Sequence, residues 1–461
     1  MKPLPLLIAL AVLVILGGLV FYTEENPPAS GDDKTPIVDL AQDSIQKVTV
    51  TRPGKDPIVV ERGEDDKWNF AAPSTVPADQ SSVNSWISSL ASMKSDRVVE
   101  ENIINWAPFG LTGQGTVQVE AEVEQGKTYR VIFGGQTPAG ANIYARLDGD
   151  PRLFTVFQHV KNGFEKEVFD LRDKRLLQVD DKVSRLVLKT SSGPIEFGKT
   201  GDDAWQILQP RLLRADNFTV GDLVRSVRSA EMMRVVEKGQ EPGGLDFSRR
   251  TASVEVVDEG GGVHTLMVAK GSDDKYYAKS SDLEGSVFEI SSTMAEGLDK
   301  QLEDFRNKKL FDFGFNEIAK LELRDGDTRV VVEKKEDKWR VTSEGMTSEE
   351  ERELDSGKVQ TAIDKLRELT AKSFTSDNEA DLGKYGLTAP LIEAKVALTE
   401  GSGDEVMISS PEKDQVYAAR AGQPSTYEVE TSAVKAIQQA IKDLLKQEEP
   451  EEDEAPPADK V

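Results

Sequence analysis

Cysteine is absent from this chain of 461 residues, and histidine occurs only at His159 and His264. The lack of cysteine excludes disulfides, thiolate zinc sites, iron–sulfur clusters and thiol nucleophiles, as well as lipoprotein-type acylation at a cysteine. It fits any cellular compartment. The two histidines lie about a hundred residues apart, so we interpret each as an ordinary surface or partly buried side chain.

Basic residues are also scarce relative to acidic ones. The chain has 57 Lys and Arg against 82 Asp and Glu, for a formal net charge of −25. This acidity argues against nucleic acid and against anionic lipid headgroups as partners, because both need a basic face. An acidic surface gives solubility and attracts basic partners or cations. The length allows about three domains.

One long uncharged run is present, at residues 4–22. As a helix it is about 28 Å long, close to the hydrocarbon thickness of a bilayer. Lys2 precedes the run, while Glu24 and Glu25 follow it. The positive-inside rule therefore predicts a single-pass helix (1–22) in the bacterial cytoplasmic (inner) membrane, with all residues after Tyr22 in the periplasm or extracytoplasmic space.

Two interpretations of this run remain open, a signal anchor and a cleaved signal peptide. The run is long and ends in Val20, Phe21 and Tyr22 with no A-x-A cleavage site there, which favours the uncleaved anchor. Residues 23–43 are polar and rich in Pro and Asp, so we interpret them as a tether.

Tryptophan reveals a repeat. Trp68, Trp205 and Trp339 each follow an acidic turn, at spacings of 137 (205 − 68) and 134 (339 − 205). Two short alternating runs precede each tryptophan and predict a hairpin. These runs are 47–52 and 57–62, 184–189 and 194–199, and 319–324 and 329–334.

An apolar helical stripe follows each tryptophan, and a second set of strands closes each unit. The stripes are Val83, Trp86, Ile87, Leu90 and Met93; Val220, Leu223, Val224 and Val227; and Val359, Ala362, Ile363, Leu366 and Leu369. The closing set holds an FGL-like turn, at 109–111, 244–245 and 385–387, and a Tyr-Ala pair, at 144–145, 277–278 and 417–418. A further helix is predicted from about Gln158, Ser292 and Thr431.

Each unit is therefore predicted to hold three strands, a helix, about four strands and a helix. Hairpins dominate, so the fold class is α+β with antiparallel sheets, in three tandem repeats. The predicted domains are 44–179, 180–315 and 316–446, and the acidic, Pro-rich segment 447–461 is predicted to be a disordered tail. Basic segments at 171–177 and 305–311 are interpreted as junctions, with a solvated edge favoured over a binding patch.

One stretch matches a nucleotide-binding pattern. Residues 193–200, GPIEFGKT, fit the P-loop spacing of Gly193, Gly198, Lys199 and Thr200. The repeat register aligns Pro194 with Pro57, however, which predicts that the stretch is the second strand of a hairpin. We therefore predict no nucleotide binding, and we interpret the recurring tryptophans and tyrosines as core residues rather than ligand-stacking ones. No catalytic, cofactor-binding or metal-ligating residue is predicted.

These architectural motifs resemble an uncharacterised family of bacterial membrane-anchored envelope proteins with repeated α+β domains. The shared features are the anchor, the hairpin-plus-tryptophan segments, the helices that follow them and the FGL-like turns, and the resemblance covers nearly all of 40–446. Members are often encoded beside ABC transporters of the gliding-motility type. The resemblance implies an accessory role in an envelope transport complex. The repeats and the missing catalytic motifs predict a non-enzymatic, membrane-anchored extracytoplasmic scaffold or partner-binding protein. The alternative is an envelope-polymer hydrolase or other enzyme whose site the sequence does not reveal.

Overall fold

The computed structural model describes residues 34–446, except 74, 75, 113, 114, 139, 181, 202 and 344–351. The chain divides into two compact units. One takes the chain up to Leu176 together with 231–237 and 288–290, and the other takes the remainder. The predicted anchor, the first part of the tether and the tail lie outside the described residues. Within the described part, no helix combines the length and the apolar character needed to cross a bilayer.

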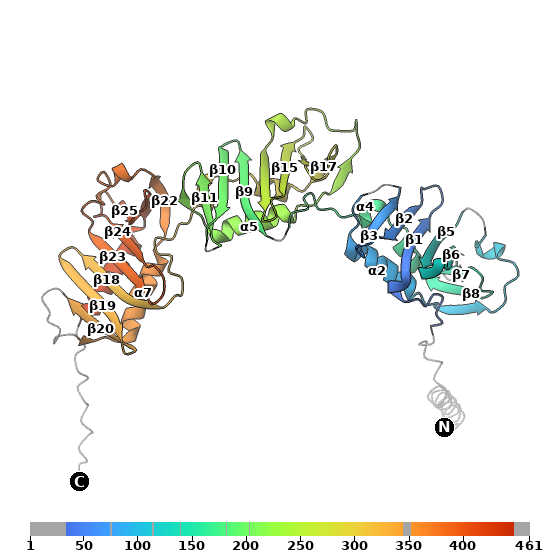
Figure 1. The fold of residues 1–461 in the computed structure, drawn as a ribbon, viewed down its shortest axis with the longest axis horizontal. Helices are drawn as coiled ribbons and strands as arrows, with labels where there is room; N and C mark the ends of the chain where they lie inside the picture. The colour runs from blue at the N-terminus through green and yellow to red at the C-terminus, as the bar shows by residue number, and fades with distance from the viewer. Residues whose placement is uncertain are drawn as a thin grey trace, which may run out of the picture. The chain divides into compact units, whose positions relative to one another are not determined.

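Three sheets account for the strands (Figure 1). The first has the order β3-β2-β1-β5-β6-β7-β8-β4. Its strands are β1 (Ile45–Thr51), β2 (Ile58–Arg62), β3 (Trp68–Ala72), β4 (Arg97–Glu100), β5 (Val117–Val123), β6 (Thr128–Gln136), β7 (Asn142–Leu147) and β8 (Leu153–Phe157).

The second sheet has the order β12-β11-β10-β9-β14-β15-β16-β17-β13. Its strands are β9 (Val183–Thr190), β10 (Gly193–Lys199), β11 (Trp205–Gln209), β12 (Leu213–Arg214), β13 (Arg234–Val236), β14 (Ala252–Asp258), β15 (Val263–Lys270), β16 (Tyr276–Ser280) and β17 (Val287–Ile290).

The third sheet has the order β21-β20-β19-β18-β23-β24-β25-β26-β22. Its strands are β18 (Ile318–Asp325), β19 (Thr328–Lys335), β20 (Lys338–Ser343), β21 (Arg352–Glu353), β22 (Ala371–Ser376), β23 (Ile392–Leu398), β24 (Asp404–Ile408), β25 (Val416–Arg420) and β26 (Thr426–Val429).

The same plan underlies all three sheets. The first strand of each repeat is central, because it pairs antiparallel with the next strand on one side and with the strand that opens the closing set on the other. The predicted α+β class with antiparallel sheets is confirmed, and three sheets with one strand order are consistent with three repeats.

The prediction of about four closing strands is wrong by one in each sheet. An additional strand, β4, β13 or β22, follows the first long helix of each repeat and lies at the sheet edge beside the last strand. Side chains of β4 are mostly exposed. An edge strand of this kind buries no full face, so it leaves no alternating pattern in the sequence.

Helices cover one face of each sheet (Figure 1). They are α2 (Gln80–Ala91), α3 (Gln158–Phe164), α4 (Val168–Leu171), α5 (Asn217–Arg228), α6 (Ser292–Gly297), α7 (Ser356–Glu368) and α8 (Thr431–Leu445). Short 3₁₀ turns are η1 (Gln42–Ser44), η2 (Ala107–Phe109), η3 (Glu124–Gly126), η4 (Phe247–Arg249), η5 (Leu302–Phe305) and η7 (Glu379–Asp381). Three of these helices begin at the residues that the sequence predicts: α3 at Gln158, α6 at Ser292 and α8 at Thr431.

An aspartate begins each of the three long helices that follow the tryptophans. The carboxylates of Asp79, Asp216 and Asp355 accept the backbone N–H of the residue three positions on, at 2.7, 2.8 and 3.1 Å. Each carboxylate satisfies one of the free N–H groups at the helix start. The helices therefore begin at equivalent positions in the three repeats.

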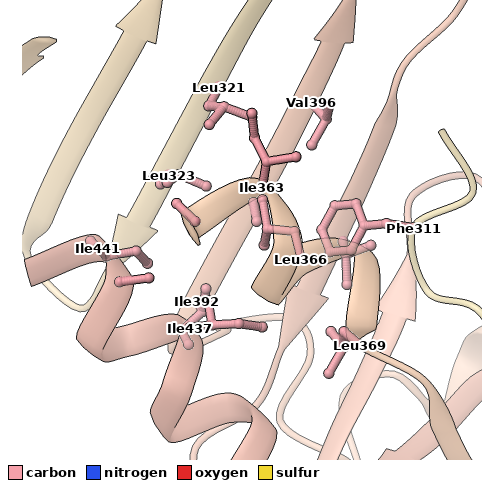
Figure 2. Packing of buried hydrophobic residues seen from close by; sticks show 14 of the residues in the cluster. Phe311, Leu321, Leu323, Ile363, Leu366, Leu369, Ile392, Val396, Ile437 and Ile441 are labelled. Atoms are coloured by element: carbon pink, nitrogen blue, oxygen red, sulfur yellow. The ribbon is translucent and has the colours of Figure 1, made fainter. Parts of the chain in front are cut away.

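The predicted stripes form the cores. In the third repeat, α7 and α8 place Ile363, Leu366, Ile437 and Ile441 against side chains of β18 and β23, as Figure 2 shows. In the second repeat Val220, Leu223 and Val227 are buried, whereas Val224 is only half-buried.

The boundaries predicted at residues 44, 180 and 316 stay a prediction, because the two compact units do not coincide with three repeats. Ile37 and Val38 fall within the predicted tether, yet both are buried in the first core. Their burial favours an earlier start for the first domain.

Candidate functional site

The P-loop-like stretch is a strand. Residues 193–199 form β10, which pairs antiparallel with β9 and β11. A P-loop needs a loop that leads into a helix, so that backbone N–H groups face the phosphates. Lys199 instead pairs with Asp203 and lies 5.6 Å from the centre of the Trp205 ring. The prediction of a hairpin strand is confirmed, and the ammonium group of Lys199 is paired with Asp203 of the turn that follows the strand.

The recurring tryptophans occupy equivalent places but differ in burial. Trp68 is 1% exposed, and its ring N–H donates to Asn84 at 3.0 Å. Trp205 and Trp339 are half-buried. The core interpretation is therefore confirmed for Trp68 and holds only in part for the other two. The turn before each tryptophan contains an aspartate with positive φ, at Asp66, Asp203 and Asp337. Aspartate tolerates this left-handed conformation better than most residues.

In the first and third repeats, the aromatic residue of the FGL-like turn packs against the tyrosine of the Tyr-Ala pair. The ring of Phe109 lies 4.9 Å from that of Tyr144, and the ring of Tyr385 lies 4.7 Å from that of Tyr417. The second repeat has glycine at 243 in place of the aromatic residue, and there Tyr277 is buried and donates its hydroxyl to Asp273 at 2.7 Å. Both motifs therefore serve packing.

The basic junction segments are amphipathic: Lys174 is half-buried and Arg175, Lys308 and Lys309 are exposed, whereas the other residues of both segments are buried. The predicted solvated edge therefore holds only for these four side chains. Arg172 and Arg306 are 8% and 4% exposed, and the apolar residues that follow them are fully covered. Those apolar residues are Leu176 and Leu177 in the first segment and Leu310 and Phe311 in the second.

Each segment joins by β-bridges to residues on either side of it in the sequence. Arg172 pairs with Ala78, and three residues later Arg175 pairs with Glu231. The second segment repeats this at the same spacing, with Arg306 on Ala215 and Lys309 on Thr370. Both segments begin where a short helix ends, at Leu171 and at Phe305, and continue through isolated β-bridges.

A third copy of this element precedes the first repeat. Pro36 forms a β-bridge to Lys94, and Ile37 and Val38 are buried after it. The three copies align in sequence as TPIV at 35–38, KRLL at 174–177 and KKLF at 308–311. This short match was the signal that sequence reasoning missed.

Arg306 forms the most buried ion pair of the second segment. Its Nη2 lies 2.5 Å from Oδ1 of Asp377, and its Nη1 lies 3.1 Å from Oδ2. Nη2 also donates to the hydroxyl of Ser425 at 3.1 Å, and the guanidinium carbon lies 3.7 Å from the centre of the Phe374 ring. A planar cation between a carboxylate and an aromatic face satisfies its charge without water.

Further charges surround this pair. Arg214 binds Asp312 at 2.7 Å, and Arg420 pairs with Asp404. Burial lowers the pKa of Arg420, and the nearby Arg214 lowers it further, although Asp404 opposes both effects. Arg214, Arg306 and Ser425 line a cavity of about 260 Å³. Because these guanidinium groups already have carboxylate partners, the arrangement favours cohesion between the second and third sheets over anion binding.

His264 lies between two carboxylates. Its Nδ1 is 2.7 Å from Oδ2 of Asp282, and its Nε2 is 3.3 Å from Oδ2 of Asp258. Burial alone lowers the pKa of His264, but hydrogen bonds and charges from both aspartates outweigh it and raise the pKa. The backbone N–H of Gly262 lowers the pKa of Asp258, as does His264. The interpretation of His264 as partly buried is confirmed, with an added ionic role.

Asp282 also binds the backbone of the segment that precedes β9. The backbone N–H of Gln178 donates to Oδ2 of Asp282 at 2.6 Å, the same oxygen that faces His264. A protonated imidazole therefore stabilises a carboxylate that also holds residue 178.

A groove lies on the helical side of the first sheet, between α2 and α3. It has a volume of about 310 Å³, and Trp86 and Phe164, with ring centres 5.9 Å apart, contribute to its lining. Lys94, His159 and Lys166 also line it, and the lining contains no Asp or Glu. His159 is exposed, in agreement with its interpretation as a surface histidine.

The sequence predicts no catalytic, cofactor-binding or metal-ligating residue. Across the described ranges, no group of three or more His, Asp or Glu side chains is arranged to hold a metal ion. The groups that come together are the Arg306 cluster, the His264 cluster and the groove at Trp86. The partners in the Arg306 cluster and in the groove lie far apart in the sequence, whereas Asp258 and Asp282 lie within 18 residues of His264.

A family model described as "Domain of unknown function (DUF4340)" matches residues 68–203, 205–390 and 345–450. The matches cover most of the chain; each begins in a different repeat, and the first two run on into the repeat that follows. No curated protein matches the chain.

Proposed function

The chain belongs to the DUF4340 family, and we propose that it is a non-enzymatic, membrane-anchored extracytoplasmic scaffold that binds partner proteins. In this proposal residues 1–22 anchor it in the cytoplasmic membrane and the repeats lie outside that membrane. The partner complex is an ABC-type envelope transporter, for which the protein is an accessory subunit.

One observation carries the scaffold proposal: the residues that recur in all three repeats serve the fold. The recurring aspartates form turns and begin helices, and the pairs Ile37–Val38, Leu176–Leu177 and Leu310–Phe311 fill cores. What distinguishes one repeat from another lies at the surface, as in the groove at Trp86. A repeated frame with varied surfaces is typical of proteins that bind several partners.

The transporter as partner rests on the resemblance to envelope proteins encoded beside ABC transporters. The direct test is mild detergent solubilisation of membranes that contain the tagged full chain, followed by affinity capture. We expect transporter subunits to co-purify. A capture that recovers the protein in good yield but no transporter subunit contradicts the accessory role.

The anchor and its orientation need a separate test. A fluorescent reporter that matures only in the cytoplasm, fused after Val461, is expected to stay dark in cells, while the fusion protein sediments with membranes. A bright fusion would place the repeats inside the cell.

A further inference from the structure

We propose that the groove at Trp86 binds the acidic carboxyl-terminal segment, residues 447–461, of a second copy of this chain. Lys94, His159 and Lys166 line this groove without any carboxylate, in a chain whose net charge is −25. A basic concavity on an acidic protein is the surface on which an acidic segment binds most favourably.

The groove is specific to the first repeat. The repeat register places Asp222 and Glu231 of the second repeat where the first has Ser85 and Lys94, which introduces two negative charges. In the third repeat, α8 is a 15-residue helix that packs along α7, whereas α3 has only seven residues. The equivalent face of α7 is therefore covered.

The lysines of the groove are available for a partner. Lys94 is exposed and Lys166 is half-buried. Among the residues that the structure describes, neither ammonium group has a carboxylate within ion-pairing distance. These two charges therefore attract an acidic ligand without first breaking an internal ion pair.

The proposed ligand is complementary to this surface in charge. Residues 447–461 contain seven Asp and Glu and one Lys, a formal charge of −6 (−7 + 1). Pro450, Pro456 and Pro457 lie among these acids. Trp86 and Phe164 line the groove but are only 3% and 1% exposed, so the charge match carries the proposal.

A second copy supplies the segment without any requirement on the arrangement of the two compact units. The segment follows α8, whose last carbonyls accept hydrogen bonds from Arg352 at 2.9 to 3.2 Å. Fifteen residues span at most about 50 Å. This step rests on the proposed function: two copies anchored in the same membrane are held near one another, which raises the effective concentration of one for the other.

The absence of cysteine allows a direct test in the full chain. One population carries Ser89→Cys, in the groove, and a second, differently tagged population carries Ala455→Cys, in the acidic segment. A disulfide forms only when the two Cα atoms approach within about 7 Å. We expect a covalent heterodimer when the detergent-solubilised populations are mixed at low ionic strength and oxidised.

The repeats provide the matched control. Ser226 is the equivalent of Ser89 in the second repeat (89 + 137 = 226), so Ser226→Cys with Ala455→Cys measures non-specific encounter. The charge reversals Lys94→Glu and Lys166→Glu together are expected to lower the yield at position 89 by about fivefold or more. The reversals Lys189→Glu and Lys308→Glu, at exposed lysines elsewhere, are expected to leave the yield unchanged.

Three results would overturn the proposal. Equal yields at positions 89 and 226 would show random collision. If Lys94→Glu and Lys166→Glu leave the crosslinking yield at position 89 unchanged, the charges of the groove do not attract the acidic segment. A chain carrying both Ser89→Cys and Ala455→Cys that crosslinks only within itself, with no heterodimer on mixing, would assign the groove to the segment of the same copy.

Discussion

Arg306 and Asp377 lie 71 residues apart in the sequence and form a two-contact ion pair, at 2.5 and 3.1 Å, in which the arginine side chain is 4% exposed. The pair joins the segment that ends the second repeat to β22 and its following loop in the third. Its energetic role can be measured, because the first junction offers a natural comparison.

Arg306→Met is expected to destabilise the third repeat by about 2 to 4 kcal/mol, below the full value for a buried pair because Asp377 is 18% exposed. The variant removes the cation and leaves the carboxylate behind. Chemical denaturation followed by hydrogen exchange of β22 and β26 measures the loss. In a double-mutant cycle, Asp377→Asn added to Arg306→Met should cost less than the two single losses summed.

Arg172→Met is the control at the equivalent position. Arg172 is buried, and burial lowers its pKa, with only partial compensation from Asp173. Among the described residues, the Arg172 side chain donates one long hydrogen bond, 3.4 Å, to the carbonyl of Asp173. Methionine here should therefore cost less than about 1 kcal/mol, or stabilise the protein. Equal losses at positions 172 and 306 would show that the Asp377 pair contributes nothing specific.

Stability of the second repeat should fall as the pH rises through the raised pKa of His264. The folded protein binds the imidazole proton more tightly than the unfolded chain, whose pKa is about 6.5. The stabilisation is therefore fully present below about pH 6.5 and is lost above it, as the pH passes the folded pKa. Hydrogen exchange of β14, β15 and β16 at pH 5.5 and pH 8.5 measures the change.

His264→Gln should remove this dependence, so that the difference from the wild type is largest at pH 5.5 and shrinks at pH 8.5. His159→Gln is the matched control, because His159 is exposed and its ring stacks on Phe157. A difference between wild type and His264→Gln that stays constant across this range would rule out imidazole protonation as the source.

Loss of a helix cap has a smaller expected effect. Asp216→Ala removes the acceptor of the Thr219 backbone N–H at 2.8 Å and of the Thr219 hydroxyl at 2.9 Å. We expect a loss of about 1 kcal/mol. Asp216→Asn keeps an acceptor oxygen at the same position and should lose less than half of that. Thermal unfolding of the two variants side by side gives the comparison, and equal losses would assign the effect to the charge alone.

Lys199→Ala tests the nucleotide-binding alternative. Lys199 pairs with Asp203 in a turn where Asp203 is 79% exposed, so the variant should change stability by less than about 1 kcal/mol. Calorimetric titration of the wild type with ATP and Mg²⁺ is expected to show no saturable heat. A saturable heat that disappears in Lys199→Ala would establish a nucleotide site despite the strand geometry.

The sequence alone determined the repeat and most of its elements. The tryptophan spacing, the paired hairpin strands before it and the stripe after it, such as Val359, Ile363 and Leu366, were sufficient, because strand and helix periods are local properties. Edge strands such as β4 escaped prediction, because they bury no complete face.

Only the tertiary structure decided which charges are buried. The segment around Arg306 reads as basic and polar, and a solvated edge is the natural expectation from its composition. The Arg306 side chain is buried because Asp377 and Phe374, about 70 residues away in the sequence, contact its guanidinium group. His264 likewise acquires its role from Asp282, which only the pairing of β15 with β16 brings near it. Burial of a charge depends on partners that no local pattern specifies.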